Sequence, residues 1–329
     1  MTPYDAIVTP PTNALNRLEA VLGAGTNADV RGLASARPFQ PTQPLDDGWG
    51  AGCSIAARLG ATQPRSTSVN NETRDIVYST KHRSELVDYP IADIDADLMF
   101  QEVFRAARAY SMVSKEALHS LFEAVKYVVR GDIPGDIVEC GVWRGGSSLL
   151  AGLTLKAAAP PSVKRRLRDA LKPRSAKRKV WLYDTFEGMT EPTERDVEIG
   201  GRTARSYIEQ YGDSGGWCYS AEDEVRQNLL SGGLSPSDFV MVKGDVLQTL
   251  RDQRPGRVSV LRLDTDWYES TKFELEVLYP LLSPGGVLII DDYGHWNGAR
   301  QAVDEYFASS RAPVFLQRTT YAVRTAVKG

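Results

Sequence analysis

Four aspartates stand at the ends of two apolar runs that are predicted to be β-strands. Asp264 and Asp266 lie in LRLDTDWYES, and Asp291 and Asp292 lie in LIIDDYGHW. Consecutive strands of a doubly wound sheet are usually neighbours, so the two pairs should meet at one edge. Because carboxylates this close repel one another unless they are protonated or share a cation, a hard ion such as Mg²⁺ is predicted there. The alternative is that each pair caps the helix that follows it.

A metal ion at this edge would lower the pKa of a bound hydroxyl group, as it does for bound water. A nearby carboxylate could then take the proton while the oxygen attacks an electrophile, and orientation of the reactants can contribute about 7–11 kcal/mol. We predict that Asp264, Asp291 and Asp292 bind the metal and that Asp266 is the general base. His295, close after the second pair, is the alternative base, or else a surface or substrate-contacting residue.

A glycine-rich segment, ECGVWRGGS at 139–147, follows the first predicted strand. Gly141 permits a tight turn, and Gly145 and Gly146 let the backbone approach a ligand before a helix begins near Ser147. In open α/β sheets a ligand binds beyond the carboxyl ends of the strands, so this turn is a candidate cofactor site. A turn of this kind can also serve packing alone.

Acidic residues at the strand ends indicate which cofactor this site holds. Glu139 could bind the ammonium group of S-adenosylmethionine, whereas it would repel a pyrophosphate. Asp184, in YDTFEG at the end of the next strand, could accept hydrogen bonds from two ribose hydroxyls. Gly244 and Asp245 end the third strand, where the adenine is expected. Since the spacing also differs from the dinucleotide pattern G-x-G-x-x-G, S-adenosylmethionine is predicted.

A second pattern, Y-x-x-x-K at Tyr268 and Lys272, matches the catalytic pair of short-chain dehydrogenases. It opens the helix directly behind the first aspartate pair, and no N-terminal dinucleotide motif precedes it. Hydride transfer is therefore disfavoured.

Strand and helix patterns alternate along the chain. Apolar, β-rich runs occur at 136–143, 180–184, 239–245, 258–264 and 286–292. Helical patterns between them include 147–157, 221–230 and 269–282. This alternation predicts an α/β fold with a mostly parallel, doubly wound sheet. The runs 313–318 and 322–327 predict a C-terminal antiparallel hairpin, so that the sheet has seven strands in the Rossmann-like plan of class I methyltransferases.

Apolar residues at helical spacing precede this alternation and predict N-terminal helices over 93–131. One face contains Leu98, Val103, Phe104 and Ala107, and the next contains Leu118, Leu121, Phe122, Val125 and Val128. Ser111 and Ser114 are candidate N-caps for the second of these helices.

Two segments differ from the predicted domain, which spans 93–329. Residues 1–92 contain a short amphipathic helical stretch, Asn13 to Leu22, followed by a run rich in small and polar residues, and we expect an extended or mobile region. The segment 160–179 is a basic insertion, interpreted as a solvated loop or helix or as a docking patch for an anionic partner.

Composition excludes several classes of protein. The formal net charge of the 329 residues is −3, which gives no basic field for nucleic acid or anionic lipid. No apolar stretch approaches the roughly 20 residues of a membrane span, and the first residues do not resemble a signal peptide. Three widely spaced cysteines fit a reducing cytoplasm, and the three histidines are too few for a His-rich metal site. We expect a cytoplasmic homo-oligomer that binds neither nucleic acid nor membrane.

With these motifs in hand, the chain resembles the macrocin O-methyltransferase family, which methylates sugar hydroxyls on antibiotics and related metabolites. The resemblance runs from about Tyr110 to Phe307 and rests on IPGDIVECGVWRGGSS, YDTFEGM, LRLDTDWYEST and IIDDYGHWNGARQAVDEY. It implies S-adenosylmethionine, Mg²⁺ and an aspartate base. The basic insertion and the long N-terminal region lie outside the shared pattern.

The sequence thus predicts an S-adenosylmethionine-dependent, Mg²⁺-dependent O-methyltransferase that acts on a hydroxyl of a sugar or glycosylated natural product. A catechol-like phenol is an alternative acceptor, because its adjacent oxygens would need the same metal. A non-catalytic binding protein that retains the fold is a further alternative.

Overall fold

The computed structural model describes residues 90–158, 178–211, 218–310 and 313–329. The predicted N-terminal stretch Asn13 to Leu22 and most of the predicted basic insertion lie outside these residues. The strands are β1 (Asp136–Cys140), β2 (Val180–Asp184), β3 (Phe239–Lys243), β4 (Val258–Leu263), β5 (Leu282–Ile290), β6 (Gln317–Arg318) and β7 (Arg324–Val327).

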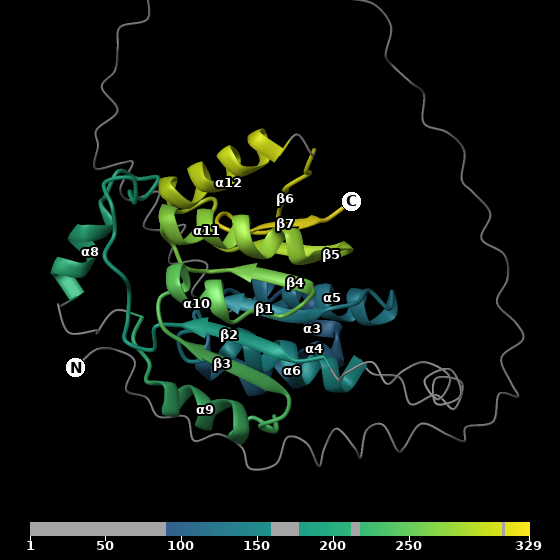
Figure 1. The fold of residues 1–329 in the computed structure, drawn as a ribbon. Helices are drawn as coiled ribbons and strands as arrows, with labels where there is room; N and C mark the ends of the chain where they lie inside the picture. Colours follow the sequence, from purple (N-terminus) through teal and green to yellow (C-terminus); the bar gives the residue numbers. More distant parts are fainter. Residues whose placement is uncertain (1–89, 159–177, 212–217, 311–312) are drawn as a thin grey trace, which may run out of the picture.

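These strands form one sheet in the order β3-β2-β1-β4-β5-β7-β6 (Figure 1). The first five are parallel to one another, whereas β7 runs antiparallel to β5 and β6 antiparallel to β7. The predicted seven-stranded sheet with a C-terminal antiparallel hairpin is confirmed. Because β1 lies between β2 and β4, the chain reverses direction across the sheet next to β1, where ligands bind in open α/β sheets.

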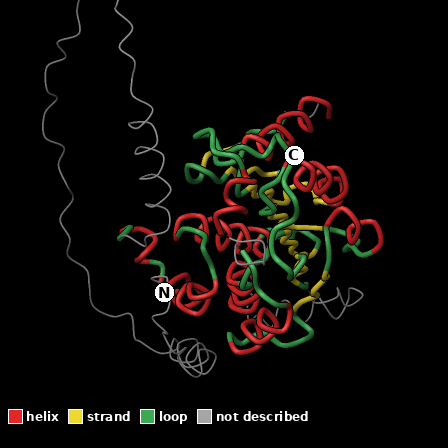
Figure 2. Tube along the Cα trace, turned by 90° about the vertical axis from the view of Figure 1, so that its left-hand side faces the viewer, coloured by secondary structure: helices red, strands yellow, loops and turns green. Residues whose placement is uncertain are grey.

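Helices connect the strands and cover both faces of the sheet (Figure 2). They are α3 (Ala92–Ala96), α4 (Leu98–Ala107), η1 (Arg108–Tyr110), α5 (Lys115–Arg130), α6 (Gly146–Ala158), α8 (Ala204–Tyr211), α9 (Glu222–Ser231), α10 (Val246–Asp252), α11 (Tyr268–Leu278), η2 (Tyr279–Leu281) and α12 (Asn297–Ser310). The helix predicted at 269–282 ends earlier, since Pro280 has no amide hydrogen to continue the α-helical bonds. Within the described residues, no helix has the length and apolar character of a membrane span.

Two apolar clusters hold these layers together. Ile137 and Val260 pack with α4, α5 and α6 on one face, and Val138 and Leu261 pack with α10 and α11 on the other. Adjacent residues of a strand point to opposite faces, so strands buried on both sides read as continuous apolar runs.

The face predicted for α5 is confirmed, since its five predicted core residues are all buried. Ser114 caps this helix by accepting a hydrogen bond from the amide of Ala117, as predicted. The prediction for Leu98 was wrong, because its side chain is 82% exposed. The buried stripe of α4 includes Phe100, and residues two positions apart in an α-helix point about 200° away from each other.

Glu274 on α11 is a fully buried acid beneath the carboxyl end of β4. Its Oε1 accepts a hydrogen bond from the hydroxyl of Thr265 at 3.0 Å, whereas its Oε2 has no partner among the described residues. Burial raises the pKa of Glu274 from its usual 4.5 to about 8, against the opposing effect of the Thr265 hydrogen bond. The folded protein therefore carries this carboxyl group in the protonated form at neutral pH.

The Glu274→Gln variant is expected to have a flatter dependence of stability on pH. The folded state keeps the Glu274 proton up to about pH 8, but the unfolded state releases it near pH 4.5. The stability that this group contributes is therefore full below pH 4.5 and is lost as pH rises through 8, by up to roughly 5 kcal/mol. Urea unfolding at about pH 5, 7 and 9 measures the difference between wild type and variant. Parallel curves would contradict the prediction.

Candidate active site

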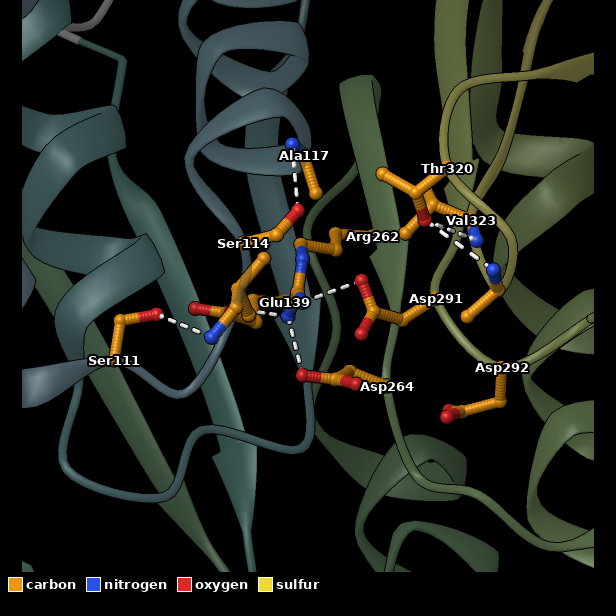
Figure 3. Close-up of polar contacts among 12 residues, drawn as sticks. Ser111, Ser114, Ala117, Glu139, Arg262, Asp264, Asp291, Asp292, Thr320 and Val323 are labelled. Atoms are coloured by element: carbon orange, nitrogen blue, oxygen red, sulfur yellow. Dashed lines mark hydrogen bonds and ion pairs between the residues drawn. The ribbon is translucent and has the colours of Figure 1, made fainter. Parts of the chain in front are cut away.

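The predicted convergence of the strand-end aspartates is observed (Figure 3). Asp264 follows β4, and Asp291 and Asp292 follow β5, its parallel neighbour. Each of the three offers a carboxylate oxygen within 4.8 Å of the others. Neighbouring parallel strands end at the same edge of the sheet, which is why the three side chains meet.

Asp266 lies beside this group in an unusual backbone conformation, with a φ of 65°. The indole Nε1 of Trp296 donates a hydrogen bond to its Oδ1 at 3.1 Å. The amide of Asp266 donates to Oδ2 of Asp292 at 3.3 Å. A left-handed conformation outside glycine is costly, so these contacts are needed to hold the residue in place.

Negative charge accumulates at this edge of the sheet. Burial raises the pKa of Asp264 and Asp292 well above the usual range, and neighbouring carboxylates raise both further. Burial likewise raises the pKa of Asp266 to about 7. The protein alone therefore does not compensate the full charge of the cluster.

Arg262 on β4 lies at the centre of the cluster, and we did not predict its role. Its Nη1 contacts Glu139 Oε1 and Asp264 Oδ2, each at 2.6 Å. Its Nη2 contacts Asp291 Oδ1 at 2.8 Å. The signal in the sequence is an arginine inside an otherwise apolar strand, two positions before an aspartate and hence on the same face.

Glu139, the predicted ligand of the cofactor ammonium group, has both carboxylate oxygens in contact with other side chains. Its side chain is 3% exposed, one carboxylate oxygen is bonded to Arg262, and the other accepts a hydrogen bond from Ser148 on α6. Because β1 is the neighbour of β4, Glu139 and Arg262 are direct register partners. Glu139 thus pairs with Arg262 and is not among the described residues that line the cavity described below, and its role toward the cofactor ammonium group stays a prediction.

The residues present fit a divalent cation. Arg262 contacts only one oxygen of Asp264 and one of Asp291, so the second oxygen of each is available beside Asp292. One guanidinium faces more carboxylates than it can neutralise. Carboxylate oxygens are the donors that Mg²⁺ prefers, and the excess of negative charge matches a hard dication.

A second group of potential metal ligands, Asp97, His119 and Glu123, lies between the N-terminal helices. Lys126 already forms ion pairs with both carboxylates, at 3.4 Å from Asp97. An internal cation thus contacts both carboxylates and balances one of their two charges, and we assign no metal to this group.

The glycine turn after β1 presses against the end of β4. Gly141 has a φ of 82°, and a Cβ there would lie 1.9 Å from the carbonyl oxygen of Asp264. Gly145 has a φ of 88° and packs on Val225 of α9. Ser147 is buried in the first turn of α6. Gly141 thus lies at the cavity, and the packing of Gly145 and Ser147 shapes the turn behind it.

Asp184 organises the same turn from the end of β2. Its carboxylate accepts hydrogen bonds from the amides of Val142 at 2.6 Å, Trp143 at 3.1 Å and Phe186 at 2.8 Å. Burial raises its pKa, and these amides act in the opposite direction. The Thr185 hydroxyl also lies within hydrogen-bond distance of Oδ1, at 3.4 Å, so a ribose hydroxyl would share the carboxylate with these four groups.

Gly244 and Asp245 follow β3, on the far side of β2. The amide of Gly244 donates to the carbonyl oxygen of Asp184 at 2.9 Å, with a φ of 133° at Gly244. Asp245 caps α10 by accepting a hydrogen bond from the amide of Leu247. Gly244 thus contacts the end of β2, and the helix cap occupies one oxygen of Asp245.

A cavity of about 470 Å³ joins the glycine turn to the aspartates. Its described lining residues are Met112, Val113, Ser114, Ala117, Gly141, Val142, Trp143, Asp184, Gly188, Met189, Tyr207, Cys218, Asp264, Asp266, Asp291, Asp292, His295, Trp296, Tyr321, Ala322 and Val323. Asp184 and Asp266 are thus reached from one space, so two reactants bound there would meet.

His295 lines the same cavity and is held by Tyr321, whose hydroxyl lies 2.7 Å from Nδ1. Glu198 Oε1 lies 4.0 Å from the same nitrogen, and Glu198 accepts a hydrogen bond from Tyr207. His295, Tyr321 and Tyr207 form a polar wall next to the aspartates, where an acceptor molecule with several hydroxyls could bind.

The Y-x-x-x-K pair serves another purpose than hydride transfer. Lys272 donates a hydrogen bond to the Tyr268 hydroxyl, which donates to Glu305 on α12. Neither residue of the pair is among the described residues that line the cavity. The pair instead connects α11 to α12.

The strand order, the antiparallel hairpin at one edge of the sheet and the glycine turn after β1 together define a known fold. It is the Rossmann-like fold of class I S-adenosylmethionine-dependent methyltransferases. A solved structure described as the O-methyltransferase NovP shares this fold, with a TM-score of 0.55 and 24% identity over 79% of this chain and 99% of that chain. Within this class, the chain belongs to the macrocin O-methyltransferase (TylF) family, because the sequence model of that family matches residues 57–318. The protein is therefore an O-methyltransferase.

Two curated relatives are similar to more than half of the chain. The 8-demethyl-8-(2,3-dimethoxy-alpha-L-rhamnosyl)-tetracenomycin-C 4'-O-methyltransferase of Streptomyces olivaceus is 36% identical over 60% of this chain and 67% of its own length. The demethyldecarbamoylnovobiocin O-methyltransferase of Streptomyces niveus is 31% identical over 73% of this chain and 77% of its own. The family match begins at residue 57, so it includes part of the region 1–92 that the motifs alone left outside the resemblance.

Proposed function

We propose that the protein transfers the methyl group of S-adenosylmethionine to a hydroxyl group of a sugar or glycosylated natural product, with Mg²⁺ as the metal. The observation that carries the proposal is the single cavity that reaches both Asp184 and the three clustered aspartates. Relatives named for rhamnosyl-tetracenomycin and novobiocin precursors support the acceptor class. The polar wall around His295 suits such an acceptor.

The cofactor supplies an electrophilic methyl group when bound. Asp184 would hold the ribose, and Gly141 would let the backbone approach the cofactor without a side chain in between. Gly145 and Ser147 shape the turn, and Gly244 with Asp245 borders the expected adenine position. The apolar residues Met112 and Val113 line the same space and would pack against a bound molecule.

Asp264, Asp291 and Asp292 would hold the metal, which lowers the pKa of the acceptor hydroxyl when bound. Asp266 would accept the hydroxyl proton on its carboxylate. Trp296 keeps that carboxylate in one orientation through its indole N–H, so the base does not swing away from the aspartates. His295 would orient the acceptor by hydrogen bonding and is the alternative base.

The purified protein should transfer label from methyl-labelled S-adenosylmethionine to glycosylated acceptors in the presence of Mg²⁺. Transfer should stop after treatment with a chelator and return when Mg²⁺ is added back. Absence of S-adenosylhomocysteine binding by calorimetry, or full transfer after chelation, would contradict the proposal.

A catechol-like phenol remains a second candidate acceptor, because Trp143 and Trp296 give the cavity aromatic walls. A panel that pairs glycosides with catechols of similar size distinguishes the two. If the protein methylates only the catechols, the proposed acceptor is a phenol and not a sugar.

A further inference from the structure

Glu139 and Arg262 form a buried ion pair behind the candidate metal ligands. The two are register partners on β1 and β4, and each side chain is only 3% exposed. Neither is among the described residues that line the cavity. Burying two charged groups away from water costs free energy, and even a well-made ion pair often does not recover that cost. The pair is therefore expected to have a role beyond stability.

The guanidinium of Arg262 connects two strand ends at once. It contacts one oxygen of Asp264 at 2.6 Å and one oxygen of Asp291 at 2.8 Å (Figure 3). A guanidinium is planar and donates in fixed directions, so it fixes the orientation of both carboxylates. Each carboxylate then has its second oxygen available to a cation.

Glu139 balances the charge of the guanidinium. Without it, the whole positive charge would face Asp264 and Asp291 and would compete with a metal ion for their oxygens. Ser148 on α6 donates a hydrogen bond to the other oxygen of Glu139, which keeps the carboxylate directed at Arg262. The chain of contacts thus runs from α6 through β1 and β4 to the ends of β4 and β5.

We propose that Glu139 and Arg262 are positioning residues of the metal centre: Arg262 orients the two ligand carboxylates, and Glu139 moderates the charge of Arg262 so that the ligands remain available to the cation. The inference rests on the proposed function, because it presumes that Asp264, Asp291 and Asp292 bind the metal. It assigns to Glu139 a role toward the metal and none toward the cofactor ammonium group.

The test measures Mg²⁺ binding by calorimetry in the absence of cofactor, and S-adenosylhomocysteine binding in the absence of metal. Glu139→Gln is expected to weaken Mg²⁺ binding by about 10- to 100-fold, as is typical of partners behind metal ligands, and to leave S-adenosylhomocysteine binding unchanged. Arg262→Lys keeps the charge but loses the planar donor geometry, and is expected to weaken Mg²⁺ binding to a similar extent. Glu274→Gln is the matched control, because Glu274 is also a buried acid near the end of β4 but does not contact Arg262.

The outcomes separate this inference from the proposed function. If wild type binds Mg²⁺ and both variants bind it equally well, the inference is overturned while the proposed function stands. If Glu139→Gln weakens S-adenosylhomocysteine binding but not Mg²⁺ binding, Glu139 is a cofactor ligand after all. If wild type binds no Mg²⁺, both the inference and the metal-dependent function that we propose are wrong. Should Glu139→Gln not fold, Ser148→Ala removes only the supporting hydroxyl, with an expected weakening of Mg²⁺ binding by about 3- to 10-fold.

Discussion

Asp291→Asn should lower kcat by about a thousandfold and abolish the response to added Mg²⁺. The substitution keeps the shape of the side chain but removes one negative charge from the three-carboxylate group that would hold the metal. It also removes a charged partner of Arg262. Steady-state rates over a range of Mg²⁺ concentrations measure both effects.

Binding of S-adenosylhomocysteine should survive this substitution, because Asp184 ends β2 and the glycine turn follows β1, whereas Asp291 follows β5. Asp304→Asn is the matched control, since Asp304 on α12 is an exposed aspartate that accepts a hydrogen bond from Tyr293. If Asp291→Asn is nearly as active as wild type, the proposal that the reaction depends on a metal ion is wrong.

The second large effect is expected for Asp266→Asn, whose kcat should fall by about 10²- to 10⁴-fold. The amide keeps the hydrogen bond with Trp296 but no longer accepts a proton. Because Asp266 is outside the group of three carboxylates, Mg²⁺ binding should stay close to that of wild type. Single-turnover rates, together with calorimetry of Mg²⁺, separate loss of the base from loss of the metal.

His295→Gln provides the comparison. His295 lies on the polar wall with Tyr321, and the substitution is expected mainly to raise KM for the acceptor. A larger loss of kcat in His295→Gln than in Asp266→Asn would reverse the two assignments, so that His295 would be the base.

The edge of the sheet at which the chemistry is expected could be predicted from the sequence. Asp264 and Asp291 each follow an apolar run, and two consecutive parallel strands usually lie side by side, so their ends meet. The same reasoning located the glycine turn and Asp184. These features depend on the order of local sequence patterns along the chain. Such patterns can be recognised without knowing which residues contact one another in the folded protein.

Contacts between segments distant in the sequence could not be predicted in this way. Leu98 fits an apolar helical pattern, but which side of α4 faces α5 and α6 depends on how the whole helix packs. His295 was recognised as a candidate, whereas its partner Tyr321 comes from the loop before β7 and has no motif of its own.

Glu139 and Arg262 show most clearly the difference between what the sequence predicts and what the tertiary structure decides. The sequence by itself determined that acids and glycines gather at the ends of parallel strands, because the strand order follows from the alternation of patterns. Only the tertiary structure decided which charges neutralise one another, because pairing depends on register between strands. Glu139 is separated from Arg262 by more than a hundred positions in the chain, yet lies directly beside it in the sheet. That register places the predicted cofactor ligand beside the buried arginine.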